Sequence, residues 1–150
     1  MMGKINSRAK GASAEREFCN LLSEYLGESL VEPLKRNLEQ TRNGGHDILG
    51  LEGMAIEIKR YKRVKESDIK KFWAQAVEQA NRAGGQPVLA YREDMCSWRV
   101  RIPWGFLMDE SWNEDVDYTL EVSLPAFATL IREHQCTSLH KNASPNTVAS

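Results

Sequence analysis

Two stretches of the chain carry apolar residues at helical spacing. The first, Ala9–Leu26, has one continuous stripe and ends before Gly27, a residue that favours a helix stop. The second can be capped by Ser67 and continues to Gly84-Gly85. The stripes consist of Ala14, Phe18, Leu21, Leu22, Tyr25 and Leu26, and of Ile69, Phe72, Trp73, Ala76, Val77 and Ala80. The pattern predicts two amphipathic helices that pack on a common core.

Shorter apolar or alternating segments predict strands between and after these helices. The segments are 34–38, 47–50, 54–61, 87–91, 98–103 and 118–122. The second and third are expected to form a hairpin around the turn Leu51-Glu52-Gly53. After the last strand, Ser123 can cap a short helix that carries Phe127, Leu130 and Ile131.

The order of these elements indicates an α/β fold. Helix, strand, hairpin, helix and strand suggest a central mixed β-sheet flanked by helices, with a small C-terminal β/α extension. A chain of 150 residues fits one domain, which we place at residues 1–135. Residues 136–150 are polar and small, so we expect a disordered tail there.

The predicted hairpin places charged side chains within an apolar context. Glu57 and Lys59 are two residues apart on a strand, so they leave the same face. With a three-residue loop, Gly50 pairs with Met54 and Asp47 falls opposite Glu57. A two-residue turn would instead direct Asp47 away from that face. The sequence favours the first register only weakly.

Two neighbouring carboxylates suggest a metal site. They repel one another when both are ionised, and a divalent cation removes that cost. Oxygen ligands favour Mg²⁺, with Mn²⁺ as a substitute. Asp47, Glu57, the backbone carbonyl of Ile58 and Glu15 are the candidate ligands, and Lys59 could orient a water or stabilise a phosphate. The alternative interpretation is a salt-bridged hairpin without catalysis.

Charge is unevenly distributed along a chain whose net charge is only −1. Residues 59–71 contain seven basic residues and two acidic ones, whereas residues 109–121 contain six acidic residues and no basic one. A polarised chain of this kind can attract DNA phosphates on one face. The alternative is a solvated surface without a partner.

Other features exclude several classes of protein. Cys19, Cys96 and Cys136 are odd in number and far apart, which suits neither a disulfide framework nor a zinc site. No apolar run is long enough to span a bilayer, and the first residues lack the apolar core of a signal peptide. We therefore expect a cytoplasmic protein, in a bacterial host if it is phage-encoded, without a membrane partner or small-molecule cofactor.

Three segments together resemble the PD-(D/E)XK nuclease superfamily. They are GASAEREF, RNGGHDILGLEGMAIEIK and DIKKFWAQAVEQA, and their order and spacing are most similar to the archaeal-type Holliday junction resolvases and their phage-encoded relatives. The resemblance covers Arg8–Tyr91. It implies metal-binding acids at Asp47 and Glu57, a catalytic lysine at Lys59 and a further helix glutamate at Glu15.

The resemblance also implies a fold and an activity. The superfamily has a restriction-endonuclease-like αβββαβ core and uses Mg²⁺ to hydrolyse DNA phosphodiesters, and its resolvases are homodimers that cut four-way junctions. His46 stands where the motif has proline, a position that varies in the superfamily. No motif matches the chain after about Arg92, and the role of residues 92–135 is open.

Several residues outside the catalytic set are candidates for DNA contact. Basic side chains could hold backbone phosphates, and Gln75 on the second helix could reach the active site. For each of them, an exposed surface role is the alternative. The candidates are Arg8, Lys10, Arg36, Arg42, Arg60, Lys62, Arg63 and Gln75.

The sequence therefore predicts a Mg²⁺-dependent structure-selective DNA endonuclease, most in keeping with a Holliday junction resolvase. A PD-(D/E)XK nuclease that acts on flaps, ends or duplex DNA is the first alternative, and a catalytically silent DNA-binding module is the second. We expect a homodimer that binds four-way junctions. Candidate interface residues are Trp98, Trp104, Phe106, Leu107 and Met108.

Overall fold

The computed structural model describes residues 7–30, 34–36, 48–49, 51, 53–108 and 113–143. Within them the helices are α1 (Ser7–Leu26), α3 (Glu66–Ala83), α4 (Trp104–Met108) and α5 (Leu124–Ala143), with short 3-10 turns η1 (Gly27–Ser29) and η2 (Val116–Tyr118). The strands are β1 (Lys35–Arg36), β2 (Ile48–Leu49), β3 (Met54–Tyr61), β4 (Gln86–Glu93), β5 (Arg99–Pro103) and β6 (Thr119–Ser123).

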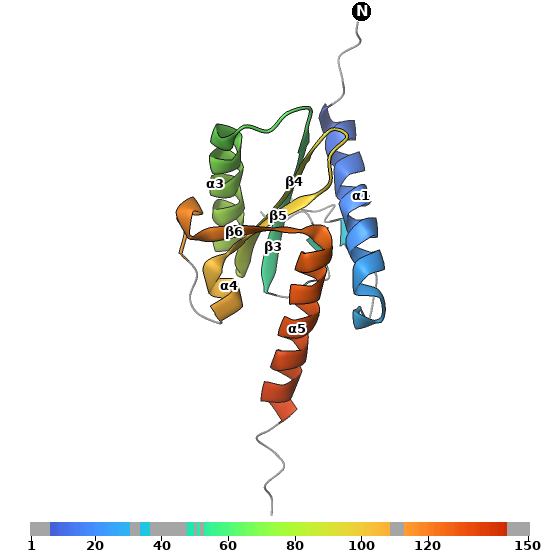
Figure 1. Cartoon of the computed structure of the whole chain (residues 1–150), viewed down its shortest axis with the longest axis vertical. Coiled ribbons are helices and arrows are strands. Elements are labelled where there is room, and N and C mark those ends of the chain that lie inside the picture. Colours follow the sequence, from blue (N-terminus) through green and yellow to red (C-terminus); the bar gives the residue numbers. More distant parts are fainter. Residues whose placement is uncertain are drawn as a thin grey trace, which may run out of the picture.

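A four-stranded mixed sheet forms the centre of the molecule, in the order β3-β4-β5-β6 (Figure 1). β3 and β4 are parallel and are connected by α3, whereas β4, β5 and β6 pair antiparallel. Two glycines make the return from α3 to β4. Gly84 ends the helix at φ 75°, and a Cβ on Gly85 would lie 3.1 Å from the carbonyl carbon of Gly53. This close approach lets β4 start beside β3.

Helices cover both faces of the sheet, which confirms the predicted α/β fold with a mixed sheet between helices. α3 lies on one side in Figure 1, and α1 and α5 lie on the other. On the α1 side, Phe18 and Phe127 belong to a core with Ile56, Val88 and Val100. On the α3 side, a smaller core contains Phe72, Trp73, Ala76, Val77, Leu89 and Tyr91.

The predicted hairpin differs from the described structure. β2 pairs antiparallel with β1, and the described residues show no ladder between β2 and β3. Asp47 and Gly50, on which the predicted register depends, lie outside the described residues. β3 therefore forms an edge of the four-stranded sheet, paired only with β4 among the described strands.

The helix boundaries also differ from the sequence prediction in two places. Ser67 does not cap α3: the N-cap is Lys65, two residues earlier, and the Asp68 carboxylate accepts a hydrogen bond of 2.8 Å from the backbone N–H of Lys65. α5 continues through residues 136–143, where the sequence analysis placed the start of the tail. Once a helix is nucleated, each further residue adds a hydrogen bond at little cost, so polar residues can extend it.

Two further predictions concern the C-terminal part. The cap at Ser123 is confirmed, since its Oγ accepts a hydrogen bond of 3.3 Å from the backbone N–H of Ala126. Trp98 and Phe106 were candidates for an interface, but each is only 5% exposed and belongs to the core. Trp104, Leu107 and Met108 are exposed, as an interface requires.

Among the described residues, none of the helices is both long and apolar enough to cross a bilayer.

Candidate active site

Glu57 and Lys59 form an ion pair on the edge strand β3. Lys59 Nζ lies 3.0 Å from Glu57 Oε1. Both side chains leave the face of the sheet that α3 covers, because their partners in the parallel register, Leu89 and Tyr91, pack against that helix. The two-residue spacing read from the sequence therefore brings this acid and this base together.

The Glu57 carboxylate is buried and only half satisfied. Glu57 is 5% exposed, and it is the one buried charged residue among the described part of the chain. Its Oε1 faces Lys59, while its Oε2 has no hydrogen-bond partner in the part of the chain that the structure describes. Leaving a buried carboxylate oxygen without a partner is costly, so the site is suited to an additional donor or cation. A divalent cation with oxygen ligands would be one such group.

Aromatic rings position the lysine. The ammonium group of Lys59 lies 5.5 Å from the centroid of the Phe72 ring, a cation–π distance, and its side chain is 20% exposed. Tyr61 in turn stacks on Phe72, with the two ring centroids 5.2 Å apart. The amine is held between an acid and a ring, with one side open to solvent.

The remaining candidate ligands are Glu15, Asp47 and the backbone carbonyl of Ile58. Glu15 lies half-buried on α1, which packs against both β1 and β3. Asp47 lies outside the described residues, and Ile58 is buried on the α1 side of β3. The described residues alone bring no three His, Cys, Asp or Glu side chains together as a metal site.

Of the candidate DNA contacts, Arg60 is committed elsewhere. It lies on the α1 face, where its guanidinium is 3.4 Å from Glu17 Oε2 and 3.3 Å from Asp94 Oδ1. Two acids thus neutralise Arg60 on the face opposite Glu57. Arg60 directly follows Lys59 on the strand, and this spacing alone indicates that the two side chains leave opposite faces.

The other candidates fall into two groups. Lys62, Arg63 and Gln75 are exposed, the first two in the loop after β3 and the third on α3. Arg8, Lys10 and Arg36 lie on described backbone, α1 for the first two and β1 for the third, but their side chains are outside the description, as is the whole of Arg42.

Sequence reasoning missed a second polar cluster on the same face of the sheet. Glu121 on β6 accepts hydrogen bonds from the Tyr91 hydroxyl and, at 3.1 Å, from Arg99. Burial, followed by the hydrogen bond and the negative charge of Glu121, raises the pKa of Tyr91 to about 12, so its hydroxyl keeps its proton at neutral pH. The only signal in the sequence was alternation: Arg99 and Arg101 are two apart, as are Thr119 and Glu121.

Comparison with known protein families identifies the family to which the chain belongs. Residues 6–139 match the family described as "Phage putative PDDEXK endonuclease". The match covers most of the chain, and the protein therefore belongs to this phage PD-(D/E)XK endonuclease family. This confirms the superfamily predicted from the three sequence segments, and extends it over residues 92–135, for which no motif was recognised.

Among solved structures, the chain is similar to the Hjc protein of Archaeoglobus fulgidus, a Holliday junction resolvase from an archaeal hyperthermophile. The two share 20% sequence identity with a TM-score of 0.43, over 76% of this chain and 84% of that one. No curated protein matches the sequence.

Proposed function

We propose that this protein is a Mg²⁺-dependent, structure-selective DNA endonuclease, and that four-way junctions are its preferred substrate. The observation that carries the proposal is the Glu57–Lys59 pair, with a buried carboxylate oxygen that has no hydrogen-bond partner among the described residues. A protein that only binds DNA gains nothing from a buried acid near phosphate, which repels the ligand and costs stability. This argues against a catalytically silent DNA-binding module.

Each residue has a distinct role in the proposed reaction. Glu57, Asp47, the Ile58 carbonyl and Glu15 would hold the metal, and Lys59 would orient the attacking water or donate to the phosphate oxygen on which charge develops. Mg²⁺, when bound, supplies charge neutralisation at the phosphate and lowers the pKa of a water; Mn²⁺ has the same ligand preference. Phe72 keeps the Lys59 amine in place beside Glu57.

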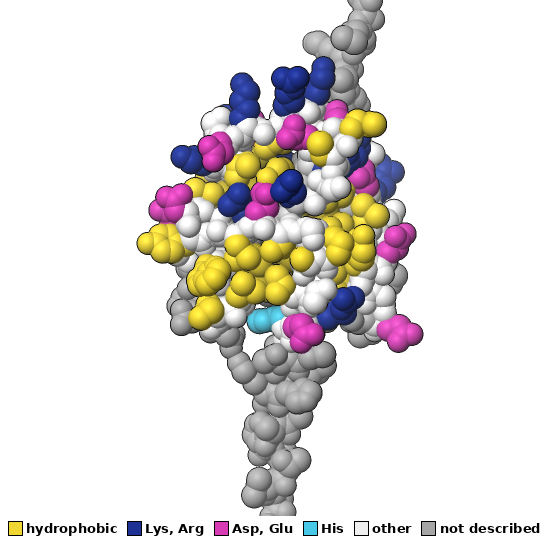
Figure 2. All heavy atoms as spheres, in the orientation of Figure 1, with side chains coloured by type: hydrophobic (Ala, Val, Ile, Leu, Met, Phe, Trp, Pro, Cys, Tyr) yellow, Lys and Arg dark blue, Asp and Glu magenta, His cyan; other side chains and the backbone are white. Residues whose placement is uncertain are grey.

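The basic residues after β3 would hold the DNA backbone without reading its sequence. Figure 2 shows Lys and Arg side chains along the upper rim of the molecule, where Figure 1 places the loop between β3 and α3. Reversing both charges, Lys62→Glu with Arg63→Glu, should weaken all DNA substrates alike and lower the slope of log K against log salt by about 2. Titrations of labelled duplex at several salt concentrations measure the slope. If the slope is unchanged, these side chains do not contact DNA.

Two symmetric cuts in a junction require two active sites, which a two-fold homodimer supplies. Figure 2 shows hydrophobic side chains gathered over β6 and α4 on one face. Trp104, Leu107, Met108 and Tyr118 are between 40% and 57% exposed and are our candidates for the contact between copies. β6 is also the other edge of the sheet, away from Glu57.

Cleavage of a labelled four-way junction, compared with a matched linear duplex, tests the function. With Mg²⁺ we expect paired incisions in opposed strands of the junction and little cutting of duplex, and with EDTA we expect neither. Junction resolution without Mg²⁺ would contradict the metal requirement. Sedimentation at micromolar concentration accompanies the assay. A monomer that nicks only linear, flapped or single-ended DNA would exclude the resolvase and leave the first alternative, a nuclease for flaps, ends or duplex.

A further inference from the structure

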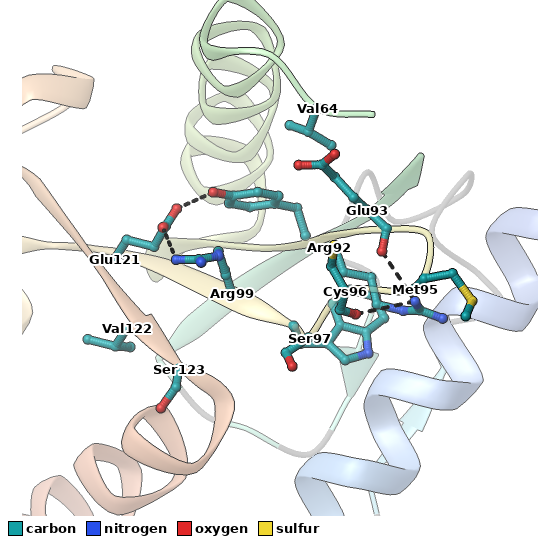
Figure 3. Close-up of a pocket in the computed structure, with 12 residues that line it drawn as sticks. Val64, Arg92, Glu93, Met95, Cys96, Ser97, Arg99, Glu121, Val122 and Ser123 are labelled. Carbon is teal, nitrogen blue, oxygen red and sulfur yellow. Dashed lines mark hydrogen bonds and ion pairs between the residues drawn. The ribbon is translucent and has the colours of Figure 1, made fainter. Parts of the chain in front are cut away.

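A pocket of about 550 Å³ lies at the end of the sheet where β4 turns into β5. Figure 3 shows its lining, which comes from the loop before α3, from β4, β5 and β6, and from the turn between β4 and β5. Arg99 and Glu121 point toward one another across it, and Val64 and Val122 supply apolar wall. Its volume lies within the range of sites that hold small organic ligands.

Strand register places residues of the pocket in the same row of the sheet as Lys59. Lys59 pairs with Tyr91, Tyr91 pairs with Arg99, and Arg99 pairs with Ser123. Neighbours in register share a face, so these side chains form one row across the sheet. Two strand spacings separate Lys59 from Arg99, which is about 10 Å between backbones. At the rise of about 3.4 Å per nucleotide along one DNA strand, that distance corresponds to about three nucleotides.

The charges that line the pocket balance. The lining carries two arginines and two glutamates, and each arginine already has a carboxylate partner: Arg92 lies 2.9 Å from Glu17 and Arg99 3.1 Å from Glu121. The pocket is therefore not an anion site of the kind that holds a phosphate alone. It offers donors and acceptors together, with apolar wall beside them. This combination suits a planar heterocycle whose edge both donates and accepts hydrogen bonds, as every nucleobase does.

Arg99 is the residue able to contact such a ligand. Its side chain is 65% exposed, and Nη1 donates to Glu121 Oε2 at 3.1 Å. A guanidinium has five N–H groups, so donors remain after this bond is made. Glu121 is held in turn by the Tyr91 hydroxyl and by Arg101 at 3.4 Å. Glu121 thus holds the Arg99 guanidinium, which is directed at the pocket.

We propose that this pocket binds an unpaired nucleotide of the DNA strand that passes from the active site over the basic loop 62–65. The inference rests on the proposed nuclease function and narrows its substrate. Bases within a duplex are stacked and paired and cannot enter a pocket in the protein, whereas a nucleotide at a branch or beside one can. The pocket then favours DNA with an unpaired nucleotide about three positions from the cut.

Arg99→Ala tests the pocket, with Arg82→Ala as the matched control. Arg82 is an exposed arginine on α3 whose ion-pair partner is Glu78. Its substitution removes one positive charge, as Arg99→Ala does, but outside the pocket. Two substrates are compared: a junction with two unpaired thymines at the branch, and the same junction fully paired. We expect Arg99→Ala to lower the cleavage rate of the first by about 10-fold or more, with less than a twofold effect on the second. Arg82→Ala should leave the ratio unchanged.

A direct binding measurement separates this inference from the proposed function. Anisotropy of a fluorescent ten-residue oligothymidylate, measured in EDTA, requires no cleavage. We expect weaker binding to Arg99→Ala than to wild type and Arg82→Ala. Equal binding by all three proteins, or equal loss of cleavage on both junctions, would overturn the pocket assignment. If wild type cuts neither junction but the oligonucleotide result holds, the nuclease proposal fails and the nucleotide site remains.

Discussion

Glu57→Gln and Lys59→Ala should each lower the rate of DNA cleavage by about 1,000-fold or more, without unfolding the protein. In the proposed reaction, each substitution removes a group that would act on the transition state, and losses of this size are usual for such groups. Gln retains the volume of Glu57 and can satisfy its buried position with an amide. Single-turnover cleavage of a labelled junction at saturating Mg²⁺ measures the effect. Asp47→Asn should behave in the same way, and Glu15→Gln should weaken metal use less, because in the proposed site Glu15 would contribute from a separate helix, α1.

DNA binding provides the control for these variants. Glu57→Gln removes a negative charge near the phosphate, so its affinity for the junction in EDTA should be equal to or higher than that of wild type. Near wild-type turnover in any variant would mean that its residue is wrongly assigned. Loss of both affinity and cleavage in Glu57→Gln would instead indicate that the buried carboxylate stabilises the fold.

The elements of this fold were predictable where one face of a segment is buried. The α3 stripe from Ile69 to Ala80 is apolar because the helix lies on β3 and β4, and its spacing gives both the helix and its orientation. The same holds for the pairing of Glu57 with Lys59, since alternation along a strand is local. The partner of residues 48–49 was not predictable: among the described strands β2 pairs with β1 and not with β3, and so short an apolar segment specifies its neighbour only weakly.

Long-range partners were the other limit. Arg60 reads as one more base in a basic run, yet it is paired with Glu17 and Asp94, which are 43 and 34 residues away. Arg99 and Glu121 are separated by 22 residues and meet only because β5 and β6 are adjacent. Residue type and local spacing hold no information on such contacts until the sheet order is known.

Glu17→Ala should lower the free energy of unfolding by about 2 kcal/mol, the largest stability effect that we expect from an acidic residue of α1. Its carboxylate accepts a hydrogen bond of 3.0 Å from the Trp98 indole, and it lies 2.9 Å from Arg92 and 3.4 Å from Arg60. These contacts join α1 to β3, to β4 and to Trp98, the residue before β5. Removal leaves two partly buried guanidinium groups close together without this acid, and hydrogen bonds to charged groups are worth about 1.5–3 kcal/mol each before solvent screening.

Urea unfolding measures the effect of Glu17→Ala, with Glu24→Ala as the control on the same helix. Glu24 is exposed, so its substitution should change the free energy of unfolding by no more than about 0.5 kcal/mol. An equal shift in the two variants would show that the Glu17 cluster adds nothing to stability. Glu17 lies on the opposite face of the sheet from Glu57. At urea concentrations well below the unfolding midpoint, folded Glu17→Ala should therefore still cleave DNA. Loss of cleavage in fully folded protein would mean that α1 also positions the catalytic strand, through Arg60 on β3.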